Sequence, residues 1–344
     1  MKKAIVALVA LVVLGALGAA AFWYVTEQRL TTFASTPFGG PEQKLVVIPP
    51  GTNPMGVARL LADEKAVASA DLLYSWVRRE KLGPRLKAGE YEFSGQLTPR
   101  QVIDKLISAQ VKQYRFTVPE GLRVDEILPL VSRTELGLDL EKLKKLTATA
   151  ALARKLGVPA DSFEGFLAPE TYSFPRGVNE ETVLKRMVGR TLELARQAKR
   201  KEGVDLDLLQ TVTLASIVEK ETGAVEERPR ISCVFHNRLR LKMRLQTDPT
   251  VIYATMLLTG RYSRNITRAD LKTDHPYNTY TIKGLPPGPI ASPGKAAIAA
   301  ALDPIACDDL FFVSRNDGTH VFCPDLDCHN AAVQKWQVDF HRKR

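Results

Sequence analysis

The feature that most constrains this chain is an uncharged stretch near its amino terminus. Residues 4–25 contain no Asp, Glu, Lys or Arg, and roughly 20 apolar residues in a helix suffice to cross the hydrocarbon core of a bilayer. Two lysines precede the stretch and three aromatic residues, 22–24, close it, as is typical of a membrane interface. Because positive charge stays on the cytoplasmic side, we expect residues 1–3 in the cytoplasm, one membrane pass over 4–25, and the rest of the chain outside.

A cleaved signal peptide is the alternative for the same stretch, since the alanines at 19–21 offer small residues at a cleavage site. The apolar run is longer than the usual core of a signal peptide, which favours an uncleaved anchor. Residues 26–44 are then expected to form a linker, because 31–41 is rich in small residues, Pro and Gly and has no periodicity.

The composition bounds the partners only loosely. The 344 residues are enough for two domains and a sizeable core, and the net charge is +10. A basic balance suits nucleic acid, anionic lipid or an acidic polymer equally well. Arg and Lys do not cluster with aromatic residues as in proteins that bind single-stranded nucleic acid, so we expect no nucleic-acid partner.

Residues 45–158 contain an internal repeat of strand, turn and helix. A short apolar strand at 45–48 ends in Pro-Pro-Gly, and the pattern returns about seventy residues later with a strand at 114–118 followed by Pro-Glu-Gly. Between the copies we expect a helix over 70–80, a strand within 86–93, and a helix that starts at Thr98-Pro99. The sequence therefore predicts a small α/β repeat module over 45–158.

The rest of the chain, residues 159–344, is predicted to be a larger mixed domain, so the fold class as a whole is α+β. Helical patterns cover 138–156 and 180–199, and strand-like alternation covers 309–313 and 319–322.

The centre of this domain is the stretch from 208 to 249. On a helix of about 3.6 residues per turn, Glu219 falls on the same arc as the apolar residues, namely Leu208, Val212, Leu214, Ala215 and Val218. Burial raises the pKa of a carboxylate, and a general acid needs such a raised pKa at neutral pH. The alternative is a buried Glu219 paired with one of the arginines that follow, which are Arg228, Arg230, Arg238, Arg240 and Arg244.

Four ordered motifs carry a resemblance to a known family. ASIVEKET (215–222), FHNRL (235–239), LQTDPTVIY (245–253) and YNTYTIKGLPPGPIASPG (277–294) resemble the YceG-like endolytic murein transglycosylases (MltG). The resemblance extends over nearly the whole chain from about residue 46. One departure is Ser292, where many relatives are expected to have Asn, and this leaves the role of Ser292 in doubt.

The resemblance implies a catalytic acid at Glu219, the first acid of VEKE, with Glu221 as the second choice. It implies a lytic transglycosylase that cuts bonds between N-acetylmuramic acid and N-acetylglucosamine and leaves 1,6-anhydro ends. From the membrane anchor we further expect the enzyme to cut nascent glycan strands and so to terminate their elongation. The muramic acetamido group would stabilise the developing cation, and Glu219 would then take the proton of that sugar's C6 hydroxyl. No cofactor or metal is expected.

The resemblance also implies candidate substrate-binding residues and partners. The loop over 163–172 combines acids and aromatics that suit one wall of a glycan cleft. The candidates are Glu164, Glu170, Tyr172, Gln246, Asp248, Tyr277, Asn278 and Tyr280. The repeat module looks like a LysM-like module, which relatives use to bind N-acetylglucosamine polymers. The expected location is the bacterial inner membrane with the bulk of the chain periplasmic, close to peptidoglycan synthases.

Two rival functions remain open at this level. An anchored, non-catalytic glycan-binding scaffold for cell-wall synthases would explain the anchor and the repeat module. An ordinary hydrolase would need a second carboxylate such as Asp248 or Glu170.

The four cysteines would face an oxidising compartment if the chain is anchored as predicted. Cys323, Cys328, His329 and His320 could be drawn as a zinc site, but the spacing is poor for a zinc knuckle. We expect disulfides or buried thiols. The two histidines also match positions of the YceG-like family, although each alone is more often structural than catalytic.

Overall fold

The computed structural model describes residues 2–340, which divide into two compact units. The first unit contains the residues up to 114 together with 174–176, and the second contains 115–173 and the residues from 177 onward. Both units mix helices and strands, which confirms the α+β class. The domain boundary predicted after residue 158 lies inside the second unit, because the second copy of the repeat belongs to that unit rather than to the first.

The first unit is a small helical layer on a two-stranded sheet. Its elements are α1 (Lys2–Ser35), β1 (Lys44–Ile48), α2 (Pro54–Asp63), α3 (Ala70–Arg79), β2 (Gly89–Phe93) and α4 (Pro99–Ile107). β1 pairs antiparallel with β2, with Lys44 opposite Phe93 and Ile48 opposite Gly89. The predicted start of α4 is confirmed, since the Thr98 hydroxyl caps the backbone N–H of Gln101 and the Gln101 side chain caps Thr98 in return.

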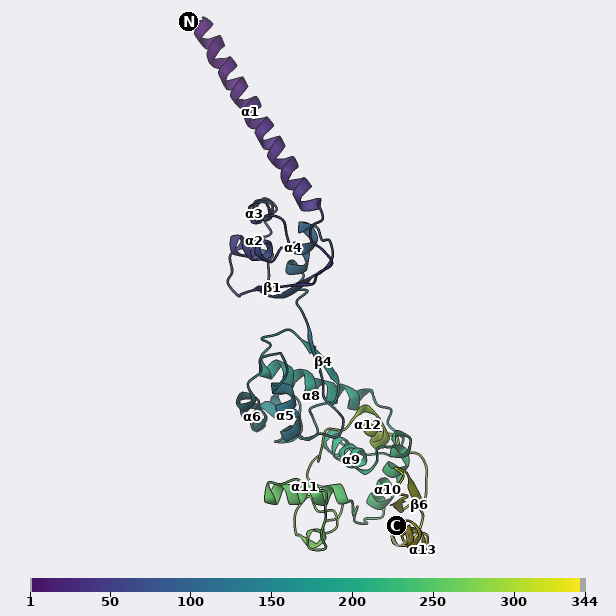
Figure 1. The fold of residues 1–344 in the computed structure, drawn as a ribbon. Helices are drawn as coiled ribbons and strands as arrows, with labels where there is room; N and C mark the ends of the chain where they lie inside the picture. Colours follow the sequence, from purple (N-terminus) through teal and green to yellow (C-terminus); the bar gives the residue numbers. More distant parts are fainter. Residues whose placement is uncertain (1, 341–344) are drawn as a thin grey trace. The chain divides into compact units, whose positions relative to one another are not determined.

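α1 is one continuous helix that is long and apolar enough to span a membrane (Figure 1). It does not end at residue 25, so the prediction of an aperiodic linker is wrong for residues 26–35. Leu30 and Ala34 are buried in the core of the first unit, and Glu27 forms a 2.8 Å ion pair with Arg79 of α3. Tertiary packing of this last part of α1 outweighs its weak local helical signal. The helix ends just before Pro37, as expected where a proline restricts the preceding residue.

The second unit is mostly helical. Its elements are β3 (Tyr114–Thr117), α5 (Val124–Ser132), α6 (Leu140–Thr147), α7 (Ala150–Lys155), β4 (Thr171–Phe174), α8 (Glu180–Gln197), α9 (Leu208–Glu221), α10 (Arg228–Arg240), α11 (Asp248–Thr259), α12 (Lys295–Leu302), β5 (Phe311–Ser314), β6 (His320–Cys323) and α13 (Leu326–Val333). β3 pairs with β4, and β5 pairs antiparallel with β6. The single helix predicted over 138–156 is two helices, because the chain leaves helical geometry at Thr149 and starts again.

All four cysteines are paired in this unit. Cys233 of α10 is bonded to Cys307, which follows α12, and Cys323 of β6 is bonded to Cys328 of α13. Of the two expectations for the cysteines, disulfides are therefore the one that holds. The first bond ties α10 to the segment that leads into β5, and the second ties β6 to the helix behind it.

Candidate active site

α9 is the helix around which the second unit is built. Asp207 caps its start through the N–H of Gln210, and the Gln210 side chain completes a capping box. Every residue from Thr211 to Val218 is buried, and α12, α10 and α8 pack against the helix (Figure 1). α9 ends at Glu221 because Thr222 adopts an extended backbone. Its last turn therefore delivers Glu219, Lys220 and Glu221 in succession at one edge of the core.

Glu219 is held in a buried ion pair. One carboxylate oxygen accepts a 2.7 Å hydrogen bond from the Arg228 guanidinium, and the other accepts a 2.9 Å bond from the N–H of Gly294. The side chains of Glu219 and Arg228 are each only 5% exposed, and Glu120 contacts the same guanidinium at 3.3 Å. Burial raises the pKa of Glu219, and the Gly294 N–H and the charge of Arg228 oppose this rise. The ion pair with Arg228 is the arrangement that the sequence offered as the alternative to a catalytic Glu219.

Glu221 has a different environment, because it lines an open cavity of about 640 Å³. Burial raises the pKa of its carboxyl group from 4.5 to about 7, and the negative charge of Asp248 acts in the same direction. A hydrogen bond from the Thr247 hydroxyl and the more distant charge of Arg238 lower the pKa in part. Glu221 is also the last residue of α9, where the negative end of the helix dipole disfavours a carboxylate. A carboxyl group with this pKa can donate a proton at neutral pH.

Two of the sequence motifs meet beside Glu221. The N–H of Gln246 donates to the carbonyl of Thr279 at 3.1 Å, and the N–H of Thr247 donates to the Thr279 hydroxyl at 3.0 Å. The Tyr280 hydroxyl then donates to a carboxylate oxygen of Asp248 at 2.7 Å. The LQTDP and YNTY segments are therefore hydrogen-bonded to each other near the end of α9. Polar side chains from both segments line the cavity.

The cavity wall combines charged, aromatic and imidazole groups. It includes Glu221, Arg238, Gln246, Asp248, Tyr280, Phe311, Phe312, His320, Leu326 and His329. Three of the predicted substrate-binding residues, Gln246, Asp248 and Tyr280, thus share a cavity with the second choice of catalytic acid. This clustering joins residues that are up to about sixty positions apart in the sequence.

Sequence reasoning did not assign a role in the site to Arg238 or Thr247. Arg238 is 7% exposed, donates 2.7 Å hydrogen bonds to the carbonyls of Leu245 and Leu310, and lies over the Phe311 ring. It joins the segment before α11 to the start of β5 and forms part of the cavity wall. The position of Arg238 in the FHNRL motif could have indicated this role. The role of Thr247 could not be predicted from the sequence, because it depends on a contact with Glu221, which is 26 positions away in the chain.

The two histidines of the carboxyl-terminal region also face this cavity. The Nδ1 atom of His320 lies 2.6 Å from a carboxylate oxygen of Glu227, which fixes the ring. His329 stacks against Phe311 with ring centroids 5.0 Å apart, and burial lowers its pKa. The His329 Nδ1 atom is buried and has no hydrogen-bond partner among the described residues. A neutral imidazole in this position is suited to hydrogen bonding with a polar ligand.

The other predicted site residues lie outside this cavity and have internal partners. The Tyr172 hydroxyl is buried and donates to the carbonyl of Ala168 at 2.7 Å, while Glu170 forms a 2.7 Å ion pair with Arg190. Asn278 is fully buried, and its amide donates to the carbonyl of Thr273 at 2.7 Å and to two neighbouring carbonyls. These three side chains stabilise the segments that they contact and do not line the cavity at Glu221.

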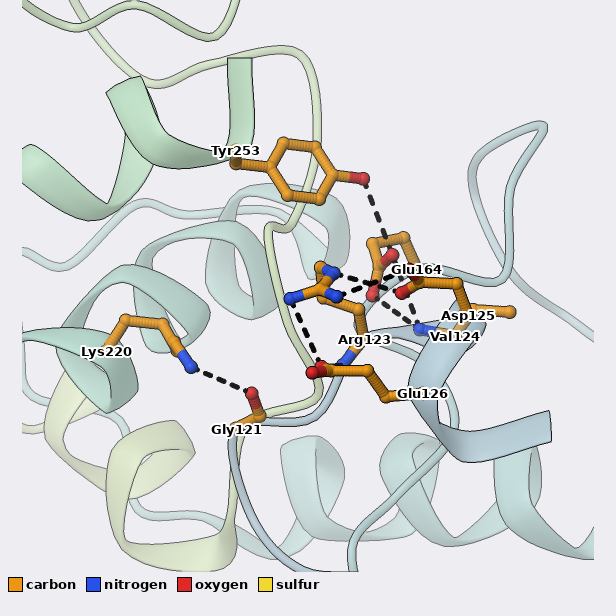
Figure 2. Close-up of polar contacts among 8 residues, drawn as sticks. All are labelled: Gly121, Arg123, Val124, Asp125, Glu126, Glu164, Lys220 and Tyr253. Carbon is orange, nitrogen blue, oxygen red and sulfur yellow. Dashed lines mark hydrogen bonds and ion pairs between the residues drawn. The ribbon is translucent and has the colours of Figure 1, made fainter. Parts of the chain in front are cut away.

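Glu164 and Tyr277 contact Tyr253 of α11 and do not line the cavity at Glu221. Glu164 accepts a 3.2 Å hydrogen bond from the N–H of Val124 and a 3.4 Å bond from the Tyr253 hydroxyl (Figure 2). Burial raises the pKa of Glu164 to about 7. Tyr277 packs on Tyr253 with ring centroids 4.9 Å apart. The loop over 163–172 is therefore anchored inward, and Phe163 and Phe166, which were expected to face a glycan, are fully buried.

Comparison with known proteins agrees with these motifs. The sequence profile of the YceG-like family matches residues 46–335. An endolytic murein transglycosylase of Bacillus subtilis (strain 168) is 32% identical over 307 residues, which cover 84% of this chain and 83% of that protein. An endolytic murein transglycosylase of Streptococcus pneumoniae serotype 2 (strain D39 / NCTC 7466) is 28% identical, and the match covers 78% of this chain and 54% of that protein.

The comparison with solved structures also finds a YceG-like protein. A crystal structure of a YceG-like protein from Listeria monocytogenes superposes with a TM-score of 0.56 at 30% sequence identity, and the match covers 85% of this chain and 99% of the other. This chain spans about half the length of the streptococcal relative, so the likeness to that protein concerns only part of it. The family match includes the repeat, α9 and all four motifs. This chain belongs to the YceG-like family.

Proposed function

We propose that this protein is a membrane-anchored lytic transglycosylase that cuts within peptidoglycan glycan strands. The observation that carries the proposal is the protonatable carboxyl group of Glu221, placed in an open cavity between the LQTDP and YNTY segments. The names of the Bacillus and Streptococcus relatives support the same substrate and reaction.

The reaction needs one group that first gives and then takes a proton. Glu221 donates its proton to the glycosidic oxygen between N-acetylmuramic acid and N-acetylglucosamine, and the bond to C1 of the muramic sugar breaks. The muramic 2-acetamido group stabilises the developing cation. The Glu221 carboxylate then removes the proton of the same sugar's C6 hydroxyl, whose oxygen closes on C1. The product is a 1,6-anhydro end, Glu221 regains its proton, and no water is consumed.

The assignment of Glu221 reverses the order of choice that the motif alone gave. Glu219 has both carboxylate oxygens occupied, by Arg228 and by Gly294, and it is absent from the wall of the cavity beside Glu221. The charge of Arg228 and the Gly294 N–H favour the carboxylate form of Glu219 and oppose the rise in pKa that burial causes. We therefore assign Glu219 a structural role, in which it ties α9 to Arg228 and to the loop before α12.

Product chemistry tests the proposal. The full chain in detergent is incubated with purified peptidoglycan, and the fragments are weighed. Fragments with 1,6-anhydromuramic ends, lighter by one water than hydrolysis products, are expected. Reducing ends equal in number to the cuts would instead indicate a hydrolase, for which Asp248 is the available second carboxylate because it faces the same cavity. Binding without any cleavage would indicate the non-catalytic scaffold.

The anchor bears on where the enzyme acts. α1 continues without a break from the apolar stretch into the core of the first unit, so this unit begins where the apolar stretch ends instead of hanging on a flexible linker. We propose that residues 4–25 span the bacterial inner membrane with the amino terminus in the cytoplasm, and that the enzyme cuts nascent strands near their synthases. The first unit would then act as a LysM-like glycan-binding module.

Glycan strand length tests this placement. Replacing residues 1–25 with a cleaved signal peptide leaves the packed part of α1, including Leu30 and Ala34, in place. The freed enzyme is expected to cut purified peptidoglycan normally but to give longer glycan strands in cells. Unchanged strand lengths at normal abundance would show that membrane proximity does not select the substrate.

A further inference from the structure

A second cavity is lined by residues that are next in the chain to two residues of the cavity at Glu221. Its volume is about 330 Å³, and its wall is formed by Arg123, Lys220, Pro249, Ile252, Tyr253, Tyr262, Arg264 and Ile290. Neighbouring residues of the chain line the two cavities in turn: Lys220 precedes Glu221, and Pro249 follows Asp248. The end of α9 and the start of α11 therefore contribute side chains to the walls of both cavities.

The cations of the second cavity are not equally available to a ligand. Figure 2 shows the Arg123 guanidinium bound to two carboxylates, at 2.9 Å to Asp125 and 3.2 Å to Glu126. Its charge is neutralised, and it supports the wall by stacking on Tyr262 at 4.4 Å. Arg123 thus builds the cavity and leaves the recognition of an anion to other groups.

Lys220 and Arg264 are the other two cations of this wall. The Lys220 ammonium group has three N–H donors, and the contact found for it is a 3.1 Å hydrogen bond to the carbonyl of Gly121 (Figure 2). Arg264 is exposed at the rim. Within residues 2–340, neither cation has a carboxylate within 4.0 Å. Two unneutralised cations beside an apolar wall of Pro249 and Ile252 suit an anion that is carried on a short aliphatic group.

On this basis, and resting on the proposed function, we propose that the second cavity binds the carboxylate of the substituent carried by muramic acid. Muramic acid differs from N-acetylglucosamine by a lactyl ether that ends in a carboxyl group, which is free or extended by a peptide with carboxylates of its own. Lys220 and Arg264 then select peptidoglycan over an uncharged glycan while Glu221 acts on the neighbouring bond. The shared chemistry is a carboxylate, and its two sources are the lactyl group and the peptide.

Three glycans separate these sources. The first carries intact peptides, the second has been stripped of peptides so that its lactyl carboxylates are free, and the third is the stripped glycan with those carboxylates converted to amides. The full chain in detergent is compared with Arg264→Gln. The matched control is Arg261→Gln, which removes the same charge from an exposed arginine of the same segment that does not line the cavity.

Arg264→Gln is expected to raise KM about five- to tenfold with kcat unchanged, as for loss of one partly exposed charge-assisted hydrogen bond. If KM rises only with the peptide-bearing glycan, the bound group is the peptide carboxylate. If KM rises only with the stripped glycan, the bound group is the lactyl carboxylate. An equal effect on all three glycans, no effect on any, or the same effect for Arg261→Gln would overturn the proposal. Affinities for the three glycans are measured in parallel. A wild-type chain that cuts none of them would overturn the proposed function, while its affinity ratios would still decide the second cavity.

Discussion

Glu219 and Glu221 flank Lys220 in the last turn of α9, and both are partly buried, but their surroundings differ in kind. Glu219 faces a guanidinium and a backbone N–H inside the protein, whereas Glu221 faces a hydroxyl and an open cavity. Burial raises the pKa of both carboxyl groups, so burial alone does not identify an acid catalyst. The comparison teaches that the partner of a buried carboxylate, and its access to a ligand, decide between a structural and a chemical role.

The largest expected effect is on catalysis. Glu221→Gln keeps the size of the side chain but removes the transferable proton, so cleavage of peptidoglycan should fall by about 100- to 10,000-fold. The rate of formation of anhydro ends measures the loss. Near wild-type turnover in this variant, together with an inactive Glu219→Gln, would return the catalytic role to Glu219.

The stability of the Glu221→Gln variant provides an independent control. The pKa of Glu221 is raised on folding, so the folded state holds a proton that the unfolded state releases between about pH 4.5 and 7. Wild-type stability should therefore decrease as the pH rises through this window, and Gln should remove that decrease. At pH 8 the variant should unfold at the same or a higher denaturant concentration than the wild type. A clear destabilisation would mean that Glu221, like Glu219, has a structural role.

Glu219→Gln should affect stability more than chemistry. It leaves the buried Arg228 with Glu120 as its remaining carboxylate partner at 3.3 Å, so we expect a loss of about 2–3 kcal/mol in the free energy of unfolding. Denaturant unfolding measures this loss. In the double variant with Arg228→Met, which removes the stranded charge, the two losses should not add. Strict additivity of the two substitutions would contradict the ion pair.

The sequence predicted much of the framework around these two residues. The strand at 45–48, the capped start of α4, and α9 itself follow from local patterns of apolar residues and caps. The choice between Glu219 and Glu221 did not follow, because a helical wheel assumes one buried face. α9 is buried on all sides from Thr211 to Val218, so the position of a residue on the wheel carries little information. The deciding partners, Arg228 and Thr247, come from other elements.

The same limit explains the error at the end of α1. The composition of residues 31–41 predicted a linker, but α1 continues to residue 35, and Leu30 and Ala34 pack in the core of the first unit. Tyr172 and Asn278 were placed in the site on the resemblance of their motifs, but the Tyr172 hydroxyl and the Asn278 amide nitrogen donate to nearby backbone carbonyls, and the Asn278 amide oxygen accepts from the Tyr280 N–H. Motifs identify which segments matter, whereas the three-dimensional contacts show which side chains in them face a ligand.

A smaller effect is expected on the pH dependence of cleavage. Activity that needs protonated Glu221 should be present below and lost above a pH of about 7. Thr247→Val removes the hydroxyl that stabilises the carboxylate form, so the pKa of Glu221 should rise and the alkaline limb of kcat/KM should move to higher pH. Rates measured across this range check the shift. An unmoved limb would show that the titrating acid is not Glu221.

The smallest expected effect has the opposite sign and comes from the adjacent residue. The negative charge of Asp248 raises the pKa of Glu221, so Asp248→Asn should move the alkaline limb to lower pH, whereas Thr247→Val moves it to higher pH. The amide oxygen of Asn can still accept the hydrogen bond from Tyr280, so the cavity wall should keep its shape. A proton on Glu221 is expected to respond to the two substitutions in opposite directions, because the Thr247 hydroxyl lowers and the Asp248 charge raises the pKa of that one carboxyl group. Abolished cleavage in Asp248→Asn, in place of a shifted profile, would instead make Asp248 the second carboxylate of a hydrolase.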